Sequence, residues 1–144
     1  MEDKFVIDAS VAVKWFIPEE YSDIALKILE SFSRRELLLY EPNSMKLEFS
    51  NAIRKYYVKG IIKKEIMFEI LNEMRRIPIS FIAIDWEKVI KAAKIALKEN
   101  LTVYDAYYLV ISDEYKIPVI TADDKFIKSA KKHYDIVHLK EFSI

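Results

Sequence analysis

Four acidic side chains are the residues of this sequence best suited to chemistry. Asp8 ends the apolar run 5–7 in "KFVIDAS", and Asp123 follows the apolar segment of "VITADDKF". Asp105 is embedded in "LTVYDAYYLV", and Glu48 lies in "MKLEFSNAIRK". A carboxylate at the end of an apolar strand is costly to desolvate unless another group stabilises it. Carboxylates gathered at one place repel one another, and Mg²⁺ or Mn²⁺ relieves that repulsion because these ions prefer oxygen ligands.

Each of these acids also has a purely structural explanation. Asp8 fits the N-cap of a following helix, as Ser10 does, and Asp123 fits a helix cap too. Asp105 fits the positive end of its helix, and Glu48, taken alone, fits a solvated helix surface. These explanations do not account for the apolar neighbours of Asp105, which predict a largely buried helix. A metal site made only of acids accounts both for the acids beside apolar strands and for an acid within a largely buried helix.

The elements that would position these acids alternate between strands and helices. Strands are predicted at 5–7, 36–42, 79–85, 116–122 and 135–139. Helices are predicted at 9–15, 22–32, 43–60, 63–76, 86–99, 102–115 and 124–132. This alternation predicts a single α/β domain over residues 1–144, with a parallel-stranded central sheet flanked by helices on both faces. Ligands of such sheets bind at the carboxyl ends of the strands, where Asp8 and Asp123 fall.

The composition excludes several other kinds of site. The 144 residues include no cysteine, which excludes disulfides, thiol catalysis and cysteine-ligated zinc. The single glycine, Gly60, excludes a Walker loop and a dinucleotide-binding fingerprint, because both need several glycines. His133 and His138 match no zinc-binding spacing. Basic and acidic residues balance at 23 each, so any contact with nucleic acid must come from a local basic patch.

The expected location is the cytoplasm. The first residues show no signal-peptide pattern, and no apolar run is long enough to span a bilayer, so we expect no membrane association. The absence of cysteine suits a reducing compartment.

The segment "IRKYYVKGIIKK" is the candidate substrate-binding patch. Its cations suit phosphates, and its aromatic rings suit stacking with single-stranded RNA. The residues concerned are Arg54, Lys55, Lys59, Lys63 and Lys64, with Tyr56 and Tyr57 between them. A solvated helix face with one tyrosine in the core explains the same segment equally well.

Four motifs together resemble PIN-domain ribonucleases, and specifically the VapC toxins of VapBC toxin–antitoxin pairs. "VIDASVAVKWFIPEE" is similar to the first motif of that family, and "LEFSNAIRK" is similar to its Glu-x-x-Asn helix. "LTVYDAYYLV" resembles the segment with the third acid, and "VITADDKF" resembles the Thr-x-Asp motif. The motifs occur in the family's order over nearly the whole chain. The resemblance implies a metal-dependent endoribonuclease that hydrolyses RNA phosphodiester bonds and acts as a toxin.

The resemblance also assigns roles to single residues. Asp8 and Asp105 are expected to ligate Mg²⁺ or Mn²⁺ directly. Glu48 and Asp123 are expected to hold a second ion, bind coordinating waters or assist proton transfer. The Thr-x-Asp pattern selects Asp123 over its neighbour Asp124. Three supporting polar side chains are expected to orient acids or waters, namely Ser10, Asn51 and Thr121.

A small VapB-type antitoxin and a homodimer are the partners that the resemblance implies. A basic side chain of the antitoxin would pair with the carboxylates, while its apolar side chains fill a nearby groove. The segment after Asp8 offers apolar surface for that contact, namely Trp15, Phe16, Ile17 and Tyr21. The same residues fit the core or a self-association surface equally well.

Two other functions remain open from the sequence. A phosphotransfer or phosphatase domain of receiver or haloacid-dehalogenase type also gathers acids at strand ends. The haloacid-dehalogenase type needs a second aspartate two residues after the first, and this chain has Ser10 there. A non-catalytic PIN-like RNA-binding module would lack some of the acids, whereas all four positions are filled.

Overall fold

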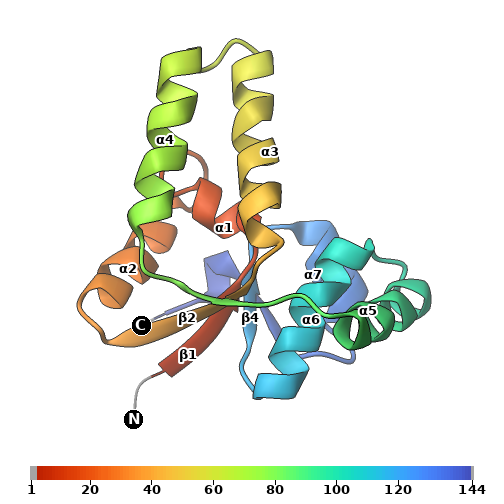
Figure 1. Cartoon of the computed structure of the whole chain (residues 1–144). Coiled ribbons are helices and arrows are strands. Elements are labelled where there is room, and N and C mark those ends of the chain that lie inside the picture. The colour runs from red at the N-terminus through yellow and green to blue at the C-terminus, as the bar shows by residue number, and fades with distance from the viewer. Residues whose placement is uncertain (1–2, 144) are drawn as a thin grey trace.

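One parallel sheet of five strands forms the centre of the molecule (Figure 1). The computed structural model describes residues 3–143. The strands are β1 (Asp3–Ile7), β2 (Leu37–Pro42), β3 (Ser80–Ile82), β4 (Val119–Thr121) and β5 (Ile136–His138), in the order β3-β2-β1-β4-β5. The chain adds β2 and β3 on one side of β1, and then β4 and β5 on the other. The predicted α/β fold with a parallel sheet is confirmed, and its switch point lies between β1 and β4.

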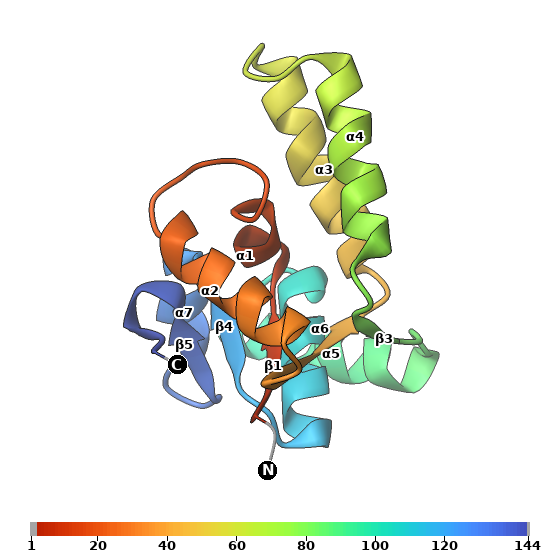
Figure 2. The ribbon, with the colours of Figure 1, turned by 90° about the vertical axis from the view of Figure 1, so that its left-hand side faces the viewer.

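The helices cover both faces of this sheet, as predicted. They are α1 (Ala9–Val13), α2 (Ser22–Ser33), α3 (Met45–Val58), α4 (Lys64–Arg76), α5 (Trp86–Glu99), α6 (Val103–Tyr115) and α7 (Asp124–Ala130), followed by the short 3₁₀ helix η1 (Leu139–Glu141). Helix α2 lies on one side of the sheet, and α5 and α6 lie on the other (Figure 2). Helices α3 and α4 stand side by side and project beyond the carboxyl ends of the strands, with α1 packed under α3 (Figure 1).

The predicted boundaries are right for the long helices and too wide for some short elements. Gly60, with φ +77°, follows the end of α3 as expected of a helix-ending glycine. Helix α1 ends before Trp15, because the amides of Trp15 and Phe16 bond to carbonyls only three residues back. Strand β4 begins after Pro118, which has no amide hydrogen to offer a sheet.

The core lies between the sheet and these helices. Helix α6 contributes seven consecutive buried residues, Ala106–Ser112, which confirms the predicted buried helix around Asp105. In residues 3–143 no helix is long and apolar enough to cross a membrane.

The segment after α1 belongs mainly to this core, so of the two explanations given for its apolar residues the structure favours packing in the core over a partner-binding surface. Trp15 is only 8% exposed, and its indole Nε1 donates a hydrogen bond of 2.9 Å to the carbonyl of Ala25. Ile17 is buried as well, and the half-buried Phe16 packs edge-on against Phe49 with ring centroids 5.7 Å apart. These aromatic side chains therefore attach the segment to its own fold, Trp15 to α2 and Phe16 to α3.

Candidate active site

Pairing of β1 with β4 brings two distant polar residues together at the switch point. Ile7 lies opposite Ile120 in the parallel ladder, and the amide of Asp8 donates to the Ile120 carbonyl at 3.1 Å. The residues that follow, Asp8 and Thr121, are therefore neighbours at the carboxyl end of the sheet. The Thr121 hydroxyl donates a hydrogen bond of 2.5 Å to Asp8 Oδ2.

Asp8 is a buried carboxylate held by several hydrogen bonds. Its Oδ1 accepts from the amide of Ser10 at 3.1 Å, so Asp8 caps α1, and it also accepts from the Ser10 hydroxyl. Burial raises the pKa of Asp8 to about 6, even though the hydroxyls of Ser10 and Thr121 lower it. The charges of Asp105 and Asp123 raise it further, which places both acids within electrostatic reach. The capping role and the clustering with other acids thus occur together in one side chain.

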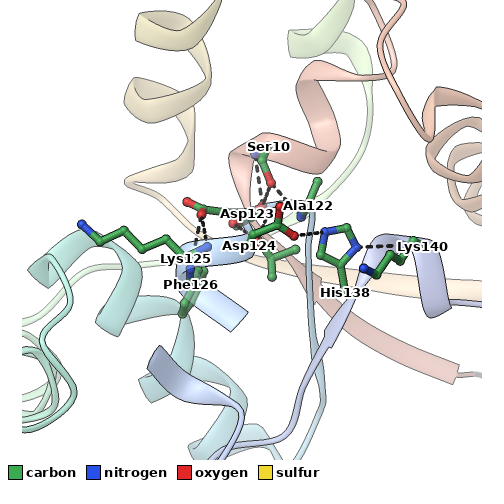
Figure 3. Close-up of polar contacts among 10 residues, drawn as sticks. Ser10, Ala122, Asp123, Asp124, Lys125, Phe126, His138 and Lys140 are labelled. Atoms are coloured by element: carbon green, nitrogen blue, oxygen red, sulfur yellow. Dashed lines mark hydrogen bonds and ion pairs between the residues drawn. The ribbon is translucent and has the colours of Figure 1, made fainter. Parts of the chain in front are cut away.

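The hydroxyls of Ser10 and Thr121 also hold the loop that carries Asp123. Ser10 Oγ accepts a hydrogen bond of 3.0 Å from the amide of Ala122, and Thr121 Oγ1 accepts one of 3.0 Å from the amide of Asp123. Each hydroxyl therefore donates to Asp8 and accepts from the loop after β4. Figure 3 shows Ser10 beside Ala122 of that loop. Ser10 and Thr121 occupy the positions that the motifs assigned to supporting groups.

The two adjacent acids after β4 point to different partners (Figure 3). Asp123 caps α7, because its Oδ1 accepts from the amides of Lys125 and Phe126 at 2.9 and 3.2 Å. Asp124 Oδ1 lies 3.0 Å from Nε2 of the buried His138. His138 Nδ1 accepts from the amide of Lys140, so Nε2 carries the hydrogen that reaches Asp124. Of the two acids, Asp123 is the one that acts electrostatically on Asp8 and Asp105.

A cavity of about 540 Å³ between α3 and α6 collects the other two acids. Its lining consists of Ala9, Leu47, Glu48, Asn51, Ala52, Lys55, Thr102, Tyr104 and Asp105. Glu48 is half-buried, and its Oε2 accepts a hydrogen bond of 3.0 Å from the hydroxyl of the fully buried Tyr108. Burial, together with the charges of Asp105 and Asp8, raises the pKa of Glu48 to about 7. Burial also raises the pKa of Asp105, and the Asp123 charge adds to that shift.

Glu41 is a buried acid beside this group that the motifs did not identify. It lies in β2, is fully buried, and accepts a hydrogen bond of 2.7 Å from the amide of Ile7 through Oε1. Its Oε2 has no hydrogen-bond partner among the described residues. Burial raises the pKa of Glu41 well above its usual value, and the charges of Asp8 and Glu48 add to this. An acid inside the apolar run "LLLYEP" was the available signal, the same one that drew attention to Asp8.

Of the other residues expected at the site, two line the acidic cavity and two do not. Asn51 lines the acidic cavity, but its Oδ1 accepts a hydrogen bond of 3.1 Å from Arg54 Nε. Arg54 itself does not line that cavity, whereas Lys55 does. Lys59 lies one turn further along, beside a second cavity.

The donor set fits a hard divalent cation. All the clustered side chains offer oxygen atoms. The pKa values of Asp8, Glu48 and Asp105 are raised, so a cation that offsets their charge is favoured at this place. Within residues 3–143 no three carboxylates or histidines are arranged to enclose an ion by themselves. Mg²⁺ tolerates such an arrangement, because it is commonly held by one or two carboxylates plus waters and substrate phosphate.

Comparison with known proteins gives one family and several relatives. The PIN domain family model matches residues 5–132. Ribonuclease VapC3 of Pyrobaculum aerophilum is 26% identical over 121 residues, which cover 83% of this chain and 89% of that protein.

Two solved structures show the same fold at low identity. VapC20 of Mycobacterium tuberculosis, described as a sarcin–ricin loop cleaving toxin, has a TM-score of 0.66 and 8% identity, covering 88% of this chain and 95% of its own. VapBC2 of Rickettsia felis, solved bound to a DNA fragment from its promoter, has a TM-score of 0.66 and 12% identity, covering 94% of this chain and 98% of that chain.

Proposed function

The chain belongs to the PIN-domain family, and on this premise we propose that it is a divalent-metal-dependent endoribonuclease, the toxin of a toxin–antitoxin pair. The observation that carries the proposal is the convergence of Asp8, Glu48, Asp105 and Asp123 at the switch point, where each of the first three has a raised pKa. Similarity to ribonuclease VapC3 supports RNA as the substrate. Action on cellular RNA would place the protein in the cytoplasm.

Each acid has a distinct part in the proposed hydrolysis. Asp8 and Asp105 would hold Mg²⁺ or Mn²⁺, and the ion would lower the pKa of water and stabilise charge on the phosphodiester. Asp123 would hold a second ion or its waters. Glu48 is suited to accept a proton near neutral pH, since its pKa is about 7. Tyr108 occupies Glu48 Oε2, which leaves Oε1 as the oxygen to take up that proton.

Cleavage of single-stranded RNA with and without Mg²⁺ or Mn²⁺ tests this function. Asp8→Asn and Asp105→Asn keep the shape of each side chain and remove one charge, so both variants should lose metal-dependent cleavage while remaining folded. Each ion should also raise the melting temperature of the wild type, because it binds only the native state. Asp105→Asn should reduce that rise. Wild-type cleavage rates in either folded variant would contradict the site assignment.

We further propose that a small antitoxin binds across α3. The acidic cavity lies on one side of the first half of α3, and an apolar cavity of about 530 Å³ lies on its other side. This second cavity is lined by Lys46, Phe49, Ser50, Leu71, Met74, Arg75, Ile77, Pro78, Ile79 and Phe81. A partner segment could fill it with apolar side chains while a basic residue pairs with the carboxylates across the helix. The solved complex of VapBC2 supports a partner of this kind.

A homodimer is the second assembly that we propose. Large apolar side chains are exposed at the start of α5 and on α3, with Trp86 79% exposed and Leu47 77% exposed. Ile84, Val103 and Tyr104 line one shallow cavity there, and Tyr104 also lines the acidic cavity together with Leu47. Exposed apolar surface of this extent is typical of a protein interface. A dimer through this surface would place the two acidic cavities near each other.

A further inference from the structure

A second, basic cavity adjoins the acidic one on the far side of α1. Its volume is about 340 Å³. Its lining consists of Ser10, Val13, Lys14, Glu19, Ala52, Lys55, Tyr56, Lys59 and Ala122. Ser10 and Ala122 belong to the hydrogen-bonded group that holds Asp8, so the basic cavity reaches the centre of the site.

The two cavities share a wall on α3. Ala52 and Lys55 line both of them, one and two turns beyond Glu48 on the same helix. Because residue 52 is an alanine, its side chain adds little bulk between the two cavities. Lys55 places a cation between the acids on one side and the basic cavity on the other. An extended chain could therefore pass from one cavity into the next without leaving the surface.

The charges of the basic cavity favour an anion. Lys14, Lys55 and Lys59 face a single acid, Glu19, so the lining carries a net positive charge. Glu19 is itself engaged, because its Oε1 lies 3.6 Å from Lys14 Nζ and its Oε2 accepts a hydrogen bond from the Tyr56 hydroxyl. The side chain of Lys14 is only 11% exposed, so its ammonium group is held in place at the cavity wall. Tyr56 adds an aromatic side chain to the same lining.

We propose that this basic cavity binds the nucleotide next to the one cleaved, holding its phosphate with Lys14 and Lys59 and its base against Tyr56. Lys55 then contacts the phosphate between the two cavities. Cations combined with an aromatic ring are the groups that bind single-stranded nucleic acid without reading its sequence. The inference rests on the proposed ribonuclease function, and it assigns a path to the RNA, from the acidic cavity over α3 into the basic one.

Salt-dependent binding of a 12-nucleotide single-stranded RNA tests this subsite. Binding is measured by fluorescence anisotropy in an Asp8→Asn background, so that the RNA stays intact, with Lys14→Met/Lys59→Met added. The slope of log affinity against log salt becomes shallower by about 0.7 for each phosphate of a single strand that no longer meets a cation. Lys14 and Lys59 hold one phosphate between them, so the double variant should be shallower by roughly 0.7. Lys98→Met, at the exposed end of α5 and outside both cavities, is the matched control and should leave the slope unchanged.

Cleavage kinetics separate this role from a structural one. With Asp8 intact, Lys59→Met should raise KM for the 12-nucleotide RNA about tenfold with little change in kcat. It should not alter cleavage of a dinucleotide, which has no phosphate to place in the basic cavity. Lys59 forms no ion pair among the described residues, so this variant leaves the Lys14–Glu19 pair in place.

The outcomes distinguish the inference from the function on which it rests. Unchanged salt slopes in variants of a protein that cleaves RNA would overturn the basic subsite and leave the ribonuclease function intact. Unchanged slopes together with weaker antitoxin binding would assign the cavity to a protein partner instead. A wild-type protein that cleaves no RNA would contradict the proposed function itself.

Discussion

The Thr121 hydroxyl donates a hydrogen bond to Asp8 Oδ2 across 113 residues of sequence and accepts one from the amide of Asp123. Thr121→Val keeps the shape of the side chain and removes both interactions. We expect metal-dependent RNA cleavage to fall about 10- to 100-fold, the usual effect of losing a group that orients a metal ligand. Thr121→Ser retains the hydroxyl and should keep most of the activity.

Circular dichroism and melting curves of both Thr121 variants provide the control. The valine variant buries a methyl group where the hydroxyl was, so it should remain folded. A folded Thr121→Val protein with full activity would show that Asp8 needs no orientation from this hydroxyl.

Asp123 and Asp124 should differ strongly in their effect on catalysis. Asp123 raises the pKa values of Asp8 and Asp105, whereas Asp124 pairs with His138 and its side chain is mostly exposed. We expect Asp123→Ala to reduce kcat at least 100-fold and Asp124→Ala to reduce it only a few-fold. Single-turnover cleavage of the same RNA by both variants measures this difference. A larger loss in Asp124→Ala than in Asp123→Ala would show that Asp124 is the metal-site acid.

Glu41 should make the metal-free protein sensitive to pH. Its raised pKa means that the folded state holds the proton more tightly than the unfolded chain does. The resulting stability is fully present below the pKa of the unfolded chain and is lost as pH rises toward the folded pKa. Glu41→Gln keeps an acceptor for the Ile7 amide and cannot ionise, so it should remove about 1.4 kcal/mol per pH unit of this dependence.

Melting curves in chelator between pH 5 and pH 9 measure the Glu41 effect. The wild type should lose melting temperature with rising pH more steeply than Glu41→Gln. Asp8, Glu48 and Asp105 have raised pKa values in both proteins. The difference between the two curves therefore reports Glu41 together with its coupling to Asp8 and Glu48. Parallel curves would mean that the Glu41 carboxyl keeps the same proton affinity in both states.

Trp86 should decide the oligomeric state. Trp86→Glu places a charge on the most exposed aromatic side chain of the proposed dimer surface and should weaken the dimer at least roughly 30-fold, as expected for a buried aromatic anchor. Leu26→Glu, on α2 at the opposite face of the sheet, is the matched control and should leave the dimer intact. Light scattering after size exclusion gives both masses. If the Trp86→Glu protein is still a dimer, the dimer interface does not include Trp86.

The order of strands and helices was predictable because each element carries its own local pattern. The apolar periodicity and the caps at Thr102 and Gly60 depend on a few neighbouring residues, and these predictions are right. The burial of Trp15 depends on the Ala25 carbonyl, which a local pattern does not reveal. The environment of Glu41 likewise depends on the Ile7 amide across the sheet. The sequence-based predictions are wrong or incomplete at residues whose environment is formed by segments distant in the sequence.

A ribosome making this chain releases Asp8 long before it releases Thr121. At roughly 5–20 residues per second, the 113 residues between them take about 6–23 s to synthesise. Throughout that interval β1 has no β4 beside it, and the Asp8 carboxylate has neither the Thr121 hydroxyl nor the Asp123 loop around it. During that interval the nascent protein therefore has no complete site. Before Thr121 emerges, the acids of the proposed ribonuclease site cannot act together on RNA.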